Sequence, residues 1–170
     1  EIAERIADWP VDGTTGAIRP YELKPGEKPE WRNAENPELF PVGVFPLMRL
    51  GTPDHGLAVR TFAARRNVNV YGWTTDSICA ARLGLADADR NGLAYLLPNH
   101  AVSYQNHPSG LMDYYGRRPA IHPYLEGSGT FATAVGEMLL QSWPETGGTT
   151  PVIRVCPALP KEWDADFRLL

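Results

Sequence analysis

The chain has 170 residues, a formal net charge of −4 and 43% hydrophobic residues, a composition typical of a globular protein with a sizeable core. The acidic balance and the scattered arginines exclude a basic surface that could wrap nucleic acid. No apolar run reaches about 18 residues and the N-terminus has no signal-peptide pattern, so we expect no membrane partner.

The chain begins without Met, inside an apparent helix, and stops in mid-pattern, which predicts a piece of a longer protein. Ile2, Ile6 and Trp9 suggest the last turns of that helix, which Pro10 ends. Residues 11–37 are rich in Gly and Pro and have no period, so they predict a long surface loop. Residues 36–48 are apolar but carry three prolines, which predicts a buried irregular or short helical passage.

Three helices are expected next. The sequence from Thr52, with a cap candidate and a proline in the first turn, predicts a helix to about Arg66. Residues 75–83 are apolar on nearly every side, which indicates a buried inner helix ended by Gly84. A third helix is predicted over residues 87–97, with Pro98 as its stop. The short connections are typical of stacked helical hairpins.

No metal and no cofactor are expected. Cys79 and Cys156 lie in apolar surroundings and are interpreted as small buried hydrophobes rather than ligands or nucleophiles. No pair of histidines has the i, i+4 spacing of a zinc helix, and no nucleophile elbow or phosphate-binding glycine loop is present.

Residues 98–125 have no period and mix planar polar side chains with tyrosines. Asn99, His122 and Tyr124 are the candidates here for binding a sugar, since a sugar offers hydroxyls at its rim and an apolar face to an aromatic ring. A long loop anchored by its tyrosines explains the same pattern equally well. Both interpretations stay open at this point.

Residues 126–142 are the stretch around which the chain is organised. Apolar residues recur at helical spacing on one buried face: Phe131, Ala134, Val135, Met138 and Leu139. Thr130 is the expected N-cap, and residues 127–129 form a flexible glycine-rich approach to it. Glu126 lies just upstream, so it is either a solvated loop charge or a positioned catalytic acid or base.

After this helix the pattern changes. Two glycines predict a turn, and residues 152–155 alternate and are β-branched, which predicts a strand. We therefore place a domain boundary near residue 150, with residues 1–150 as the helical part and residues 151–170 as the start of a β-domain.

The closing segments resemble the end of the catalytic domain in glycoside hydrolase family 95 and related glycosidases. The likeness rests on residues 137–142, a turn, a short strand, and a Pro-Ala-Leu-Pro sequence followed by Trp163. It extends upstream through residues 36–40, Gly72-Trp73 and residues 81–87. Residues 1–35 match nothing specific.

This resemblance implies an (α/α)6 toroid or barrel, of which the chain would be the C-terminal portion, and a secreted or periplasmic enzyme. The family's Asp-Gly-Asn segment falls on Glu126, Gly127 and Ser128, so the resemblance assigns Glu126 to the base side of an inverting reaction. The substitution of Glu for Asp lengthens that side chain by one methylene. The general acid and the water-activating asparagines of the family lie upstream of this chain.

We therefore expect a glycosidase fragment that cleaves a terminal sugar, such as an α-L-fucoside or α-L-galactoside, from oligo- or polysaccharide, with the rest of the barrel as its partner. Trp73 could stack on the sugar or belong to the core. Asp76 could line the site or complement the helix dipole. The alternatives are a non-catalytic carbohydrate-binding toroid and a polysaccharide lyase using Tyr114 and His122.

Overall fold

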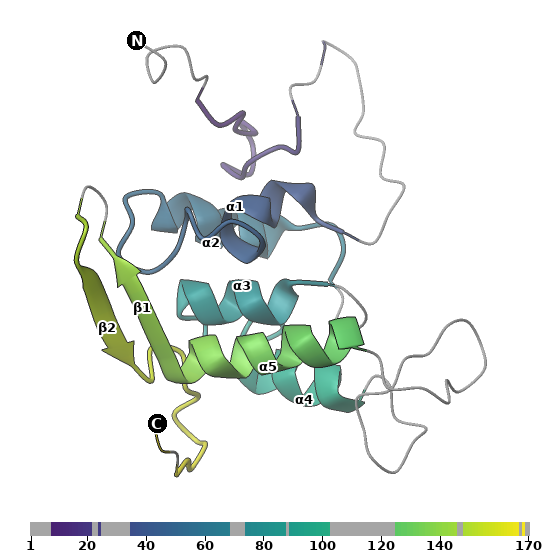
Figure 1. Ribbon diagram of the computed structural model, residues 1–170. Coiled ribbons are helices and arrows are strands. Elements are labelled where there is room, and N and C mark those ends of the chain that lie inside the picture. The colour runs from purple at the N-terminus through teal and green to yellow at the C-terminus, as the bar shows by residue number, and fades with distance from the viewer. Residues whose placement is uncertain are drawn as a thin grey trace.

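The computed structural model describes residues 8–21, 24, 35–68, 74–87, 89–102, 125–145, 148–166 and 168. This part of the chain is mainly helical and has one short two-stranded sheet (Figure 1). In chain order the elements after the N-terminal segment are η2 (Pro37–Leu39), α1 (Phe40–Gly43), α2 (His55–Ala64), α3 (Asp76–Leu83), α4 (Leu93–Val102), α5 (Leu125–Leu139), β1 (Leu140–Pro144) and β2 (Pro151–Val155).

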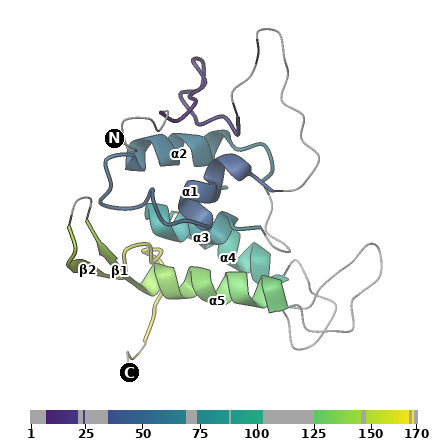
Figure 2. The ribbon, with the colours of Figure 1, turned by 45° about the horizontal axis from the view of Figure 1, so that its top comes forward.

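Helix α3 is the centre of the fold. Helices α1 and α2 pack on one side of it and α4 and α5 on the other (Figures 1 and 2). Every residue of α3 is buried, which confirms the predicted inner helix. Gly84 ends α3 with a left-handed φ of 72°, and its N–H bonds back to the carbonyls of Ala80 and Ala81.

The proline-rich passage before α2 contains the short helical turns η2 and α1, as the sequence predicted. The predicted burial holds only in part, because Val44, Phe45 and Leu47 are exposed. Thr52 does not cap α2, contrary to the expectation. Its hydroxyl accepts from the N–H of Arg49 and donates to the Arg49 carbonyl, so it closes the preceding turn. The predicted helix at the N-terminus falls on residues 1–7, outside the described residues, and Trp9 is exposed and not helical.

Helix α5 carries the predicted buried face. Ala134 and Met138 belong to the core, and Phe131, Val135 and Leu139 pack against it. The predicted start at Thr130 was wrong, because α5 already begins at Leu125 and Thr130 is an interior helical residue.

Tertiary packing explains the earlier start of α5. Gly127, in the first turn, is buried, and its backbone is hydrogen-bonded to the ring of His100 on α4. Glycine opposes helix formation by only about 1 kcal/mol relative to alanine, so a packed neighbour can override it. Residues 126–129 are therefore helical and not a flexible approach loop.

Helix α4 begins and ends later than predicted, and Pro98 lies inside it. Residues 87 and 89–92 form bends and turns instead, where Gly92 is required because a Cβ there would lie 1.6 Å from the carbonyl oxygen of Asp87. Pro98 lacks the N–H that would bond to the preceding turn. The Asn99 side chain reaches back and donates to the Tyr95 carbonyl at 2.7 Å, which supports the helix across the proline.

Strand β1 follows α5 without a break and pairs antiparallel with β2, from Leu140 opposite Val155 to Pro144 opposite Pro151. Strand β2 was predicted, whereas β1 was read as the end of the helix. The buried Gln141 stabilises the change from helix to strand, because its Nε2 donates to the carbonyls of Ala81 and Glu137. Residue 150, the expected domain boundary, lies in the connection between these paired strands.

Two glycines in this fold give opposite predictions. Gly136 lies inside α5 and a Cβ there would meet nothing within 4 Å, so Gly136→Ala should raise the free energy of unfolding by about 0.5–1 kcal/mol. Gly43 lies where α1 meets α3, and a Cβ would come within 2.5 Å of Thr75 Oγ1. Gly43→Ala should therefore destabilise. Denaturant unfolding checks both variants, and a stabilising Gly43→Ala would contradict this packing.

Candidate functional site

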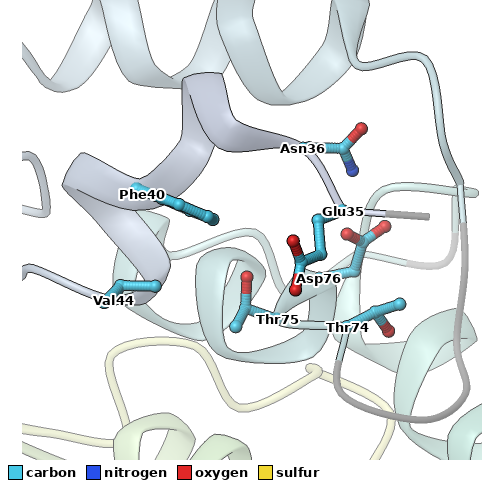
Figure 3. Close-up of a pocket in the computed structure, with 7 residues that line it drawn as sticks. All are labelled: Glu35, Asn36, Phe40, Val44, Thr74, Thr75 and Asp76. Carbon is cyan, nitrogen blue, oxygen red and sulfur yellow. The ribbon is translucent and has the colours of Figure 1, made fainter. Parts of the chain in front are cut away.

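A hollow lies between residues 35–44 and the N-terminal end of α3, and we call it the α3 pocket. Its volume is about 110 Å³. Because roughly 10–15 Å³ of such volume holds one water, it has room for several waters or for part of a sugar ring. Figure 3 shows the lining residues, which are Glu35, Asn36, Phe40, Val44, Thr74, Thr75 and Asp76.

One wall of the α3 pocket is fixed by two asparagines. Asn36 Nδ2 donates to the Asn67 carbonyl at 2.8 Å, and the Asn67 N–H donates to Asn36 Oδ1 at 3.1 Å. Asn67 Nδ2 also donates to the Glu35 carbonyl. These bonds tie residues 35–36 to the segment after α2, and the Glu35 side chain points toward the start of α3, beside Thr75 and Asp76 (Figure 3).

Asp76, the first residue of α3, forms a buried ion pair. Its Oδ2 accepts from Arg65 Nε at 2.7 Å, and the two side chains are 3% and 0% exposed. Arg65 Nη1 donates to the Phe62 carbonyl and to Asn91 Oδ1, both at 2.6 Å, and the guanidinium lies 3.8 Å from the centre of the Phe62 ring. The ion pair thus fixes the Asp76 side chain against the end of α2, while Asp76 also lines the pocket.

Glu38 is a second buried carboxyl group close to this pair. The residue is 6% exposed, and its Oε2 has no hydrogen-bond partner. Burial raises the pKa of the Glu38 carboxyl. A hydrogen bond with the backbone of Glu38 itself lowers this pKa and the negative charge of Asp76 raises it, so the net direction is upward. Glu38 lies on η2 between Asn36 and Phe40, two residues of the pocket wall.

The ion-paired Asp76 of the pocket wall therefore lies close to a second buried carboxyl group, Glu38 on η2, whose pKa is raised. Carboxyl groups in different environments are how one site can supply both a base and an acid. The partly exposed Phe40 ring adds an apolar face of the kind that covers the C–H face of a sugar.

The structure places only some of the predicted site residues at the α3 pocket. Asp76 lines the α3 pocket, whereas Asn99 is not among the lining residues and braces α4. Trp73, His122 and Tyr124 lie outside the described residues, as do Tyr114 and the rest of residues 103–124. Glu126 is in the first turn of α5, and its side chain also lies outside the description.

The N-terminal ends of α3 and α5 lie at the same end of the helical stack (Figures 1 and 2). Asp76 and Glu126 both belong to these first turns. The fold thus brings the backbones of these two acids to one end of the molecule, although 50 positions separate them in the sequence.

His100 is buried in the core between α3, α4 and α5. Its Nδ1 is 3.4 Å from Ser77 Oγ, and its ring meets the Phe131 ring edge-on at 5.7 Å. Burial lowers the pKa of His100 in spite of the hydrogen bond with the Gly127 backbone. Cys79 is equally inert, since burial raises the pKa of its thiol to about 12. Both residues are structural.

A second hollow, of about 250 Å³, is lined in part by Asp87, Asp89, Asn91 and Gly92. This spacing is that of the first ligands of an EF-hand loop, but Pro98 stands where that loop has its bidentate Glu. The Asn91 oxygen, which would be a calcium ligand in such a loop, instead accepts a hydrogen bond from the Arg65 guanidinium. Among the described residues, no group of three or more His, Cys, Asp or Glu side chains is arranged to hold a metal ion.

Sequence reasoning missed Glu35, Asn36, Glu38 and Arg65. Arg65 was considered only as part of the helix predicted to end near Arg66, and Glu38 only as part of a matching segment. The one available signal was a run of acid, amide and aromatic residues at 35–40, next to three prolines.

Comparison of the chain with protein-family models, with curated proteins and with solved structures gives no match. In the described residues, none of the helices has the length and apolar character needed to cross a membrane.

Proposed function

We propose that the chain is part of an inverting glycosidase built on an (α/α)6 toroid, which releases a terminal sugar such as α-L-fucose or α-L-galactose from oligo- or polysaccharide. The remainder of the toroid would come from the rest of the protein. A polysaccharide substrate is consistent with action outside the cytoplasm, so we include a secreted or periplasmic location in the proposal.

The observation that carries this proposal is the α3 pocket, whose wall includes Glu35, Asp76 and the Phe40 ring, with the Glu35 side chain beside Asp76 (Figure 3). Carboxyl groups are the acids and bases of glycoside hydrolysis, and an aromatic ring binds the apolar face of a sugar. The buried α3, with helices packed on both of its sides, supports the toroid, in which inner helices point one end at the active site.

In this proposal Glu126 is the base-side carboxylate, and Asp76 accepts hydrogen bonds from sugar hydroxyls. Trp73, His122 and Tyr124 are further predicted contacts to the sugar. The Asn99 side chain bonds to the Tyr95 carbonyl within α4, so we rank Asn99 below the other predicted contacts to the sugar.

The test is to incubate the whole protein with α-L-fucosyl and α-L-galactosyl oligosaccharides and to follow the reaction by proton NMR. We expect release of the free sugar, first as the β-anomer, because an inverting enzyme reverses the anomeric configuration. An unsaturated, ultraviolet-absorbing product would show a lyase. Binding without turnover would show a non-catalytic carbohydrate-binding toroid. The absence of both binding and turnover would refute the proposal.

A further inference from the structure

Glu38 is the group in the described structure whose burial most needs explaining. It is a carboxyl group that is 94% buried with no hydrogen bond to Oε2, and an ionised carboxylate in that state costs several kcal/mol of desolvation. The carboxyl group has a hydrogen bond with the backbone of Glu38 itself, but Oε2 has none, and keeping the proton avoids the desolvation cost. Glu38 lies on η2, between Asn36 and Phe40 of the pocket wall.

The charged groups on the elements around η2 do not relieve this burial. Arg65, after α2, bonds to Asp76 through Nε and to Asn91 through Nη1, and its Nη2 has no hydrogen-bond partner. Arg60 of α2 donates to the Gly16 carbonyl. Arg82 of α3 is bonded to Glu137 and to carbonyls of α1. Asp76 of α3 adds a negative charge, and α1 contains no charged residue.

We propose that Glu38 is a protonated carboxylic acid at neutral pH and that it acts on the α3 pocket through Asp76, as a positioning residue. While Glu38 is neutral, Asp76 is the one buried carboxylate next to Arg65 and stays ionised and oriented toward the pocket. When Glu38 loses its proton, a second negative charge beside Asp76 competes for the same guanidinium. The site then loses its fixed acceptor for a sugar hydroxyl.

The first half of this inference is tested by infrared spectroscopy of the whole protein at pH 7. Wild type minus Glu38→Gln should show the C=O stretch of one protonated carboxyl group, and the band should disappear on raising the pH. Glu145→Gln, at an exposed glutamate, should show no such band and is the control. Absence of the band in the Glu38 difference spectrum would overturn the proposal.

Stability gives a second measurement that depends on the same proton. The folded protein holds the Glu38 proton above pH 4.5, whereas the unfolded chain releases it near that pH, so wild type loses stability relative to Glu38→Gln as pH rises through this window. The melting temperature of Glu38→Gln should therefore exceed that of wild type increasingly from pH 4.5 to 8. A difference independent of pH would overturn the proposal.

The second half rests on the proposed function and is tested with L-fucose as the probe, by calorimetry. Wild type should bind L-fucose less tightly as the pH rises past the Glu38 titration, whereas Glu38→Gln should keep its affinity. An identical pH profile in both proteins would refute the action through Asp76. If wild type binds no L-fucose at any pH, the proposed substrate is wrong, and the infrared result still decides the state of Glu38.

Discussion

Asp76→Asn is expected to lower the free energy of unfolding by about 3–5 kcal/mol, the cost of removing one partner from a buried ion pair. The substitution keeps the shape of the side chain but leaves the Arg65 guanidinium buried without a counter-charge. A simple dipole effect at the start of α3 would be worth only about 0.3–1 kcal/mol. Equilibrium denaturation in urea measures the difference.

A matched control is the pair between Arg154 and Glu145, at 3.3 Å, whose glutamate side chain is 60% exposed. Glu145→Gln should change stability by less than about 1 kcal/mol, because water screens exposed pairs. If Asp76→Asn costs as little as Glu145→Gln, the buried ion pair does not hold α3 to α2. Asp76 would then be the helix-dipole residue that the sequence alone suggested.

Glu126→Gln is expected to lower kcat by roughly 10²- to 10⁴-fold in the whole protein, the usual contribution of a general acid or base. Glutamine is nearly isosteric with glutamate but does not take up a proton from the attacking water. The position is in the first turn of α5, where a lost acid costs only about 0.3–1 kcal/mol of dipole interaction, so the melting temperature should move little. Steady-state kinetics on the substrate identified by NMR measures the effect.

Two further variants complete the Glu126 experiment. Glu126→Asp should keep more activity than Glu126→Gln, because it retains a carboxylate, which the proposed base needs. Glu162→Gln, at an exposed glutamate near the C-terminus, should leave kcat unchanged. Normal turnover of Glu126→Gln would remove Glu126 from the reaction and leave it as an ordinary charge in the first turn of the helix.

The local features of the fold could be predicted from the sequence. The apolar repeat in α5 predicted its buried face, the all-round apolar pattern of residues 75–83 predicted the inner helix, and Gly84 predicted where that helix ends. These signals are local, since helical periodicity and a left-handed glycine depend on residues within one or two turns. The β-branched run that predicted β2 is also a local signal.

The ends of α4 and α5, strand β1 and the site depended on contacts between distant residues. Packing of Gly127 against His100 made α5 longer than its glycines predict, and Gln141 bonds to Ala81, 60 positions away, where the chain turns into β1. The Arg65–Asp76 pair likewise joins the end of one helix to the start of the next. Charge type and periodicity do not reveal which distant groups meet.

For the site, the sequence alone selected Asp76 as an acid near a helix start, and the resemblance selected Glu126. Only the tertiary structure showed that Asp76 is paired with Arg65, that Glu35 and Phe40 line the same pocket, and that Glu38 is buried with no hydrogen bond to Oε2. The reason is physical: ionisation depends on burial and on neighbouring charges, and both exist only once the chain has folded.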